Sequence, residues 1–276
     1  MGAAPSNLAV RLGTAAVGLP VILGTNYFAP PWAFYLIVLG ASLVGARELF
    51  GMTHPHDRAS QWIGIFLSGL ASGVVYLRYD DADALLAVLV GVPLSGLLVT
   101  LLRLGAIETA AHRAFALGVG PLLVAVPLTL LAVIRQASGT AAPGFVLLAL
   151  GLAWFTDTGA YFAGRFAGRH PLYEAVSPKK TIEGAIGGLV ASVVWAVLGT
   201  LGYLRGELPL LHAVVLGVVG GVLGQAGDLG ESLLKRSTGV KDSGNIVPGH
   251  GGVLDRVDAL IMTAVVVFFY SRLVRR

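Results

Sequence analysis

Residues 228–258, DLGESLLKRSTGVKDSGNIVPGHGGVLDRVD, form a charged segment between two long apolar segments. Five acidic and four basic residues alternate there with glycine and one proline: Asp228, Glu231, Asp242, Asp255 and Asp258, and Lys235, Arg236, Lys241 and Arg256. Ionisable side chains are nowhere else so dense in this chain. We therefore expect the rest of the fold to hold this segment at a functional site.

The remainder of the chain is too apolar for a soluble protein. Of the 276 residues, 55% are hydrophobic and 12% are charged, and the mean hydropathy is +0.80. A helix needs ~20 residues to cross a ~30 Å hydrocarbon core. Nine apolar segments approach that length: 8–24, 30–50, 61–77, 83–102, 114–134, 144–166, 184–203, 209–229 and 257–273. The sequence thus predicts an all-α polytopic integral membrane protein with about nine transmembrane helices and charged cytoplasmic active-site loops, although the third and fourth segments could form one broken hairpin.

We expect one membrane-embedded unit with no separate soluble domain. Residues 1–140 would supply transmembrane helices for a scaffold, a membrane cavity and a dimer contact, and residues 141–276 would form the catalytic transmembrane region. The chain has no cysteine, which excludes disulfides and thiolate metal sites.

The basic residues predict an orientation in the membrane. With nine spans, the N-terminus and the loops after the even-numbered spans share one side, which carries 13 of the 19 Lys and Arg residues. The positive-inside rule makes this side cytoplasmic. We therefore expect a multi-pass protein of the cytoplasmic (inner) membrane whose active site faces the cytoplasm. The Arg-rich C-terminal tail is the discordant part.

Asp157 is an isolated carboxylate inside the sixth apolar segment. At that depth it costs at least ~2.5–3.5 kcal/mol unless it faces water, a cation or a ligand. The alternative is a structural carboxylate that is hydrogen-bonded to Thr156, Thr158 or a tyrosine on a neighbouring helix.

Two lysines stand just before the seventh segment, in the run SPKKT from Ser177. Either Ser177 caps a helix that begins at Pro178, or Thr181 caps one that begins later. Both choices leave Lys179 and Lys180 beside free backbone amides, a suitable place for a di- or triphosphate. The alternative is an ordinary basic flank of a membrane helix.

Two carboxylate pairs flank the charged segment. Asp228 and Glu231 are three residues apart at the end of one apolar segment, and Asp255 and Asp258 repeat this spacing at the start of the next. Residues three apart share one face of a helix. Carboxylates at converging helix ends suit Mg²⁺, and the glycines between them would let backbone amides approach phosphate oxygens. A solvated loop is the alternative.

Specific positions in this region resemble the signature of the phosphatidate cytidylyltransferases, also called CDP-diacylglycerol synthases. They are Ser232-x-Leu234-Lys235-Arg236, Lys241-Asp242-x-Gly244 and Pro248-Gly249-His250-Gly251-Gly252-Val253-x-Asp255-Arg256-Val257-Asp258. The stretches Trp154-x-x-Asp157-Thr158-x-Ala160-Tyr161, Ser177–Gly184 and Gly227-Asp228-x-x-Glu231-Ser232 are also similar. The resemblance covers residues 154–258.

This resemblance implies an enzyme of phospholipid biosynthesis that joins CTP to phosphatidate, releasing pyrophosphate, with Mg²⁺ and room for a second cation, Mg²⁺ or K⁺. It also implies a homodimer, and nucleic acid is not an expected partner. The expected catalytic residues are Asp228, Asp255, Lys241, Asp258 and Arg256. The expected substrate-binding residues are Lys179, Lys180, Ser177, Thr181, Lys235, Arg236, His250, Gly251, Gly252 and Asp157. The expected metal ligands are Asp228, Asp255 and Glu231.

Two other functions stay open. A CTP-dependent kinase acting on a polyprenol or phytol would need the same membrane and nucleotide, but it would release CDP. A cation-coupled transporter could use Asp157 as its ion site, although this function leaves the cytoplasmic signature unexplained.

Overall fold

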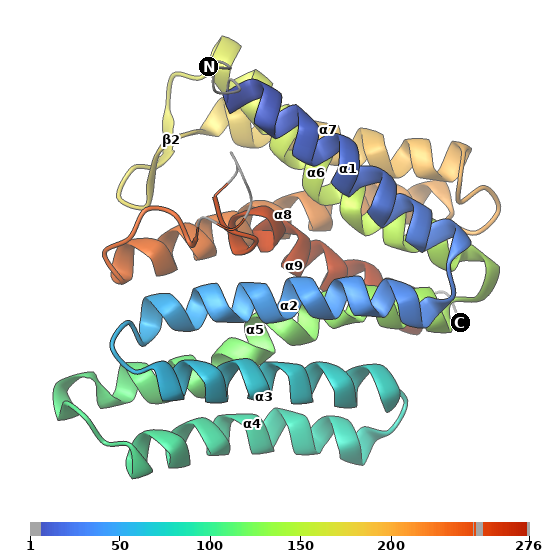
Figure 1. Cartoon of the computed structure of the whole chain (residues 1–276). Coiled ribbons are helices and arrows are strands. Elements are labelled where there is room, and N and C mark those ends of the chain that lie inside the picture. Colours follow the sequence, from blue (N-terminus) through green and yellow to red (C-terminus); the bar gives the residue numbers. More distant parts are fainter. Residues whose placement is uncertain (1–6, 245, 247–250, 275–276) are drawn as a thin grey trace, which may run out of the picture. The chain divides into compact units, whose positions relative to one another are not determined.

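A computed structural model describes residues 7–244, 246 and 251–274 of the chain, with the backbone alone at 7–15 and 274 (Figure 1). Nine α-helices lie within these residues: α1 (Asn7–Phe28), α2 (Pro31–Thr53), α3 (Arg58–Leu77), α4 (Ala82–Leu102), α5 (Ala110–Ala137), α6 (Ala142–Ala167), α7 (Ile182–Leu201), α8 (Leu210–Ser237) and α9 (Leu254–Phe269). Short helical turns lie at Ile107–Thr109, Gly139–Ala141 and Tyr270–Val274. Each predicted apolar segment coincides with one α-helix.

The predicted fold class, an all-α polytopic membrane protein, is confirmed. Among the described residues, seven helical segments are long and apolar enough to cross a membrane, and α1 adds the shorter apolar stretch Ala16–Phe28. The third and fourth predicted segments are two separate helices, because Asp81 caps α4 by accepting hydrogen bonds from the amides of Asp83 and Ala84, both at 3.1 Å. The exact number of nine spans stays a prediction.

One small hairpin interrupts the helices. Strands β1 (Pro171–Tyr173) and β2 (Ser177–Thr181) pair in antiparallel fashion. The prediction that Ser177 caps a helix is therefore wrong, since β2 begins there. The alternative is confirmed, because the Thr181 hydroxyl accepts a hydrogen bond from the Gly184 amide at 3.1 Å and caps α7. Lys179 and Lys180 thus lie on a strand.

The chain packs as two compact units, of which the first comprises Met1–Ala132 and Val240–Arg256. In this unit α3 lies beside α2 and α4 (Figure 1). Ala46, Phe50 and Leu117 form a buried cluster. A Cβ atom added to Gly96 would lie 2.3 Å from the Gly118 nitrogen, so glycine allows α4 and α5 to pack closely.

The second unit comprises Val133–Gly239 and Val257–Arg276. Its helices α6 and α7 approach through small residues, since a Cβ on Gly187 would lie 2.2 Å from the Ala163 Cβ. Helix α9 is tied to α6 by a hydrogen bond from the Thr263 hydroxyl to the Ala149 carbonyl at 2.9 Å. This close packing fixes α6, which carries the exposed Asp157, beside α7.

Candidate active site

A pocket of about 480 Å³ lies within the second unit, among α6, β2, α7 and α8. Six residues predicted to form the site line it: Asp157, Ser177, Lys179, Lys180, Thr181 and Asp228. They come from segments as far apart in sequence as residues 157 and 228. The pocket therefore brings together the acids and bases that the sequence separates.

One face of α6 supplies a wall of the pocket. Asp157, Ala160, Tyr161, Gly164 and Arg165 all line it, which is the spacing of a single helical face. The Arg165 guanidinium donates a hydrogen bond to the Tyr161 hydroxyl at 2.9 Å. The sequence interpretation assigned no role in the site to Tyr161 or Arg165. The helical spacing from Asp157 could have found both.

The hairpin supplies the lysines, and Glu183 anchors it to α7. One carboxylate oxygen of Glu183 accepts hydrogen bonds from the Arg169 and His170 amides at 3.0 and 3.3 Å, and the other lies 2.5 Å from the His170 Nδ1. The Ile182 amide also donates to the His170 carbonyl at 2.9 Å. These contacts fix the position of the hairpin at the start of α7.

Asp228 on α8 forms an ion pair with Lys180 inside the pocket. The two side chains keep 28% and 27% of their surface exposed, although the Lys180 ammonium nitrogen itself is buried. One turn earlier, the Gln225 side-chain amide donates hydrogen bonds to the carbonyls of Ala185 and Gly221 at 3.2 and 3.1 Å. These bonds hold the face of α8 that carries Asp228 toward the pocket.

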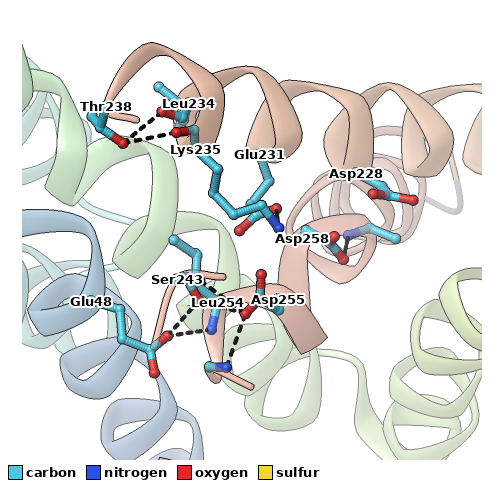
Figure 2. A network of polar contacts seen from close by, with 12 residues as sticks. Glu48, Asp228, Glu231, Leu234, Lys235, Thr238, Ser243, Leu254, Asp255 and Asp258 are labelled. Carbon is cyan, nitrogen blue, oxygen red and sulfur yellow. Dashed lines mark hydrogen bonds and ion pairs between the residues drawn. The ribbon is translucent and has the colours of Figure 1, made fainter. Parts of the chain in front are cut away.

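Other carboxylates surround Asp228 in the second unit. Glu231 forms an ion pair with Lys235 one turn further along α8, and both side chains are largely buried (Figure 2). The Asp258 carboxylate lies within electrostatic range of Asp228, Asp157 and Glu231. This concentration of negative charge is suited to a bound cation.

The oxygen donors in the pocket fit Mg²⁺ together with a phosphate ligand. In the part of the chain that the structure describes, no three His, Cys, Asp or Glu side chains form a group that could hold a metal ion. Mg²⁺ usually takes one or two carboxylates and completes its octahedron with water and phosphate oxygens. Asp157 and Asp228 supply two carboxylates beside the two lysines, which fits a metal–nucleotide complex better than an all-protein metal site.

Asp255 belongs to the first unit and has different surroundings. Its Oδ2 atom accepts hydrogen bonds from the Ser243 amide at 3.1 Å, the Ser243 hydroxyl at 2.9 Å and the Gly252 amide at 2.9 Å (Figure 2). Gly251 has a φ angle of +81°, which favours glycine. The prediction that Asp255 and Asp228 hold one cation stays a prediction.

The sequence interpretation missed Glu48 on α2. This side chain is only 6% exposed and accepts hydrogen bonds from the Ser243 hydroxyl and from the amides of Val253 and Leu254 (Figure 2). A carboxylate inside an apolar segment was the signal that singled out Asp157, and the same argument applies to Glu48.

The other predicted residues lie on the surface or outside the described residues. Arg236, Lys241 and Arg256 are exposed. His250, predicted to bind substrate, falls outside the described residues, as do Pro248 and Gly249.

Comparison with known proteins gives one family and several relatives. The model of the cytidylyltransferase family matches residues 9–274. The phosphatidate cytidylyltransferase of Staphylococcus haemolyticus is 45% identical over 117 residues, which are 42% of this chain and 45% of that protein. The phosphatidate cytidylyltransferase of Bacillus subtilis is 42% identical over 127 residues, which are 45% of this chain and 46% of that protein. The matched region thus spans less than half the length of each relative.

Proposed function

The chain belongs to the cytidylyltransferase family, and from this premise we propose that it transfers the CMP moiety of CTP to phosphatidate, giving CDP-diacylglycerol and pyrophosphate. The observation that carries the proposal is the pocket that holds Asp157 and Asp228 together with Lys179 and Lys180. Carboxylates beside ammonium groups suit a nucleotide triphosphate that arrives with a divalent cation.

In the proposed reaction, an oxygen of the phosphatidate phosphate attacks the α-phosphorus of CTP. A new P–O bond forms there, and the bond from the α-phosphorus to the oxygen bridging to the β-phosphorus breaks. Pyrophosphate takes the electron pair and leaves in line. Both reactants are anions, so positioned cationic side chains lower the barrier, and no protein nucleophile is needed.

The pocket residues receive roles from their chemistry. Lys179, Lys180 and Arg165 would bind the CTP phosphates and then the departing pyrophosphate. Asp157 and Asp228 would hold Mg²⁺, which when bound neutralises charge on the phosphates. The Ser177 hydroxyl would orient a phosphate oxygen by donating a hydrogen bond to it.

The signature residues complete the proposal. We assign Lys235, Arg236 and Arg256 to the lipid phosphate and Lys241 to the CTP phosphates. Supporting roles at Mg²⁺ or a second cation go to Asp255, Asp258 and Glu231. A homodimer in the cytoplasmic (inner) membrane is part of the same proposal, with the pocket open to the cytoplasm so that CTP can enter and the acyl chains of phosphatidate stay in the bilayer.

Labelled CTP tests the reaction. Purified protein with phosphatidate and Mg²⁺ should move cytidine label into the lipid phase and release pyrophosphate, and EDTA should stop it. A CTP-dependent kinase would instead place the γ-phosphate in lipid and release CDP, and a transporter would consume no CTP. Absence of cytidine label from the lipid would overturn the proposal.

Cysteine labelling tests the orientation, and the natural chain offers a background without cysteine. Glu174, in the turn between β1 and β2, and Asp80, between α3 and α4, are both exposed. A membrane-impermeant maleimide added to intact cells should label Asp80→Cys and spare Glu174→Cys. In inverted vesicles the pattern should reverse, and labelling of Glu174→Cys but not of Asp80→Cys in intact cells would contradict the proposed orientation.

A further inference from the structure

Glu48 is a buried carboxylate with a complete set of neutral hydrogen-bond donors. Its Oε1 accepts from the Val253 amide at 3.0 Å, and its Oε2 accepts from the Leu254 amide at 2.8 Å and the Ser243 hydroxyl at 3.1 Å. These donors are about two hundred residues away in sequence, so Glu48 joins α2 to the signature segment.

Two of these donors belong to the start of α9. The first amides of a helix have no partner within the helix, and the positive end of the helix dipole lies there. Glu48 satisfies the amides of Val253 and Leu254 with a negatively charged acceptor. It therefore caps α9 from another helix and determines where α9 begins, one residue before Asp255.

The third donor links Glu48 to Asp255 itself. The Ser243 hydroxyl lies 3.1 Å from Glu48 Oε2 and 2.9 Å from Asp255 Oδ2, and the Ser243 amide also donates to Asp255 (Figure 2). The packing is tight, because a Cβ on Gly244 or Gly252 would come within 2.6 Å of a Glu48 oxygen. The glycines of the signature leave room for this carboxylate.

We propose that Glu48 is a positioning residue that fixes the direction of the Asp255 carboxylate through Ser243 and the start of α9. The inference rests on the proposed function, in which Asp255 supports a cation at the CTP phosphates. Glu48 acts without touching substrate, as partners of metal-binding residues often do.

The first test is Glu48→Gln in the full chain, assayed in detergent micelles for cytidine label in lipid. One oxygen becomes an amide nitrogen that faces a backbone donor. We expect kcat to fall roughly 10- to 100-fold, while KM for CTP stays within about threefold because Glu48 does not contact CTP. The Mg²⁺ concentration for half-maximal rate should rise. Glu48→Asp, which retains a carboxylate, should recover part of kcat, and Glu108→Gln at an exposed position of the same unit should match wild type.

The second test is hydrogen exchange, which needs no activity. In Glu48→Gln, the amides of Val253 and Leu254 should exchange faster than in wild type, while α6 and α7 keep their protection. If Glu48→Gln unfolds as a whole, Ser243→Ala serves instead, with faster exchange at 252–255 and lower kcat. Unchanged exchange at these amides, or a kcat within threefold of wild type, would overturn the inference. A wild-type protein that places no cytidine in lipid would overturn the proposed function, and the exchange result would still decide the Glu48 contact.

Discussion

Carboxylates in the two units have different partners. In the first unit, both oxygens of Glu48 face backbone amides and a serine hydroxyl, and the side chain is buried. In the second unit, Asp228 faces the ammonium group of Lys180 and remains partly exposed. Neutral donors fix a carboxylate in place, whereas a cationic side chain that lines a pocket can be exchanged for a ligand. This difference supports the proposals that Glu48 positions a neighbouring residue and that Asp228 binds a ligand.

Replacing the carboxylates one at a time should have the largest effect. Asp228→Asn and Asp255→Asn should each lower formation of CDP-diacylglycerol about a thousandfold, since each removes a negative charge proposed to hold the cation at the reacting phosphates. Only Asp255→Asn should also lower Tm, because its amide group would meet the donors of Ser243 at a cost of about 1–3 kcal/mol. The partly exposed pair of Asp228 is worth about 1 kcal/mol or less.

Product assays and thermal unfolding in the same detergent measure both effects. Glu174→Gln, at an exposed turn of the hairpin, is the control and should match wild type in both. Activity of Asp228→Asn within tenfold of wild type would contradict its role in binding, and equal Tm losses in the two variants would contradict the comparison.

Lys180→Ala should have the next largest effect. A hydrogen bond to a charged group is worth about 1.5–3 kcal/mol, so KM for CTP should rise roughly 10- to 100-fold. Arg205→Ala removes an exposed basic residue of the same unit and should leave KM unchanged. Steady-state kinetics with varied CTP measure the difference. A change confined to kcat would argue that Lys180 acts after binding.

Gly252→Ala should disturb the network of the first unit by steric contact alone. The added Cβ would lie 2.0 Å from the Ser243 hydroxyl oxygen and 2.6 Å from a Glu48 oxygen. We expect a roughly tenfold lower kcat and a lower Tm, because overpacking costs about 1–3 kcal/mol. Gly51→Ala, where a Cβ meets nothing within 4 Å, is the matched control. Equal behaviour of the two variants would show that the contact at Gly252 is easily relieved.

The smallest expected effect is a dependence of stability on pH in the first unit. Burial lowers the pKa of His54, in the turn between α2 and α3, from 6.5 to about 4, and Arg113 and His112 act in the same direction against Asp57. Between about pH 4 and pH 6.5, His54 therefore binds a proton in the unfolded chain but not in the folded chain. Stability from this group is complete above about pH 6.5 and is lost as the pH falls toward about 4.

Thermal unfolding between pH 4 and 7 measures this effect. Wild-type Tm should fall by several degrees toward pH 4, and His54→Gln should reduce the slope. His56→Gln changes an exposed neighbour and should keep the wild-type slope. Identical slopes in all three proteins would mean that His54 does not cause the dependence.

The sequence predicted much of the fold because apolar segments in a membrane must be helices. Every predicted segment is a helix, and α8 continues to Ser237, which allows Glu231 and Lys235 to pair. The hairpin was missed at Ser177 because Pro178 is acceptable both in the first turn of a helix and in an edge strand. Backbone pairing across the hairpin and the Thr181 cap decided between them.

The candidate site was predictable where chemistry or spacing made a residue conspicuous. Asp157, Asp228 and the lysines stood out as charges in an apolar chain. Arg165 required the helical face of α6 to be followed from Asp157 toward its end. Glu48 was conspicuous as a carboxylate in an apolar segment, but its role could not be predicted because no local pattern in the sequence links residue 48 to residues 243–254.

The ion pair of Lys180 and Asp228 gives the pocket an internal counter-ion before any ligand arrives. In the proposed function, a cation that binds Asp228 would make the ammonium group of Lys180 available for the phosphate that the cation brings. Binding would then be an exchange of partners, in which neither Lys180 nor Asp228 is left without an opposite charge in a region of low dielectric. This exchange would favour a metal–phosphate complex over either ion alone. A cation alone would leave Lys180 without an acidic partner, and a phosphate alone would leave Asp228 without a basic partner.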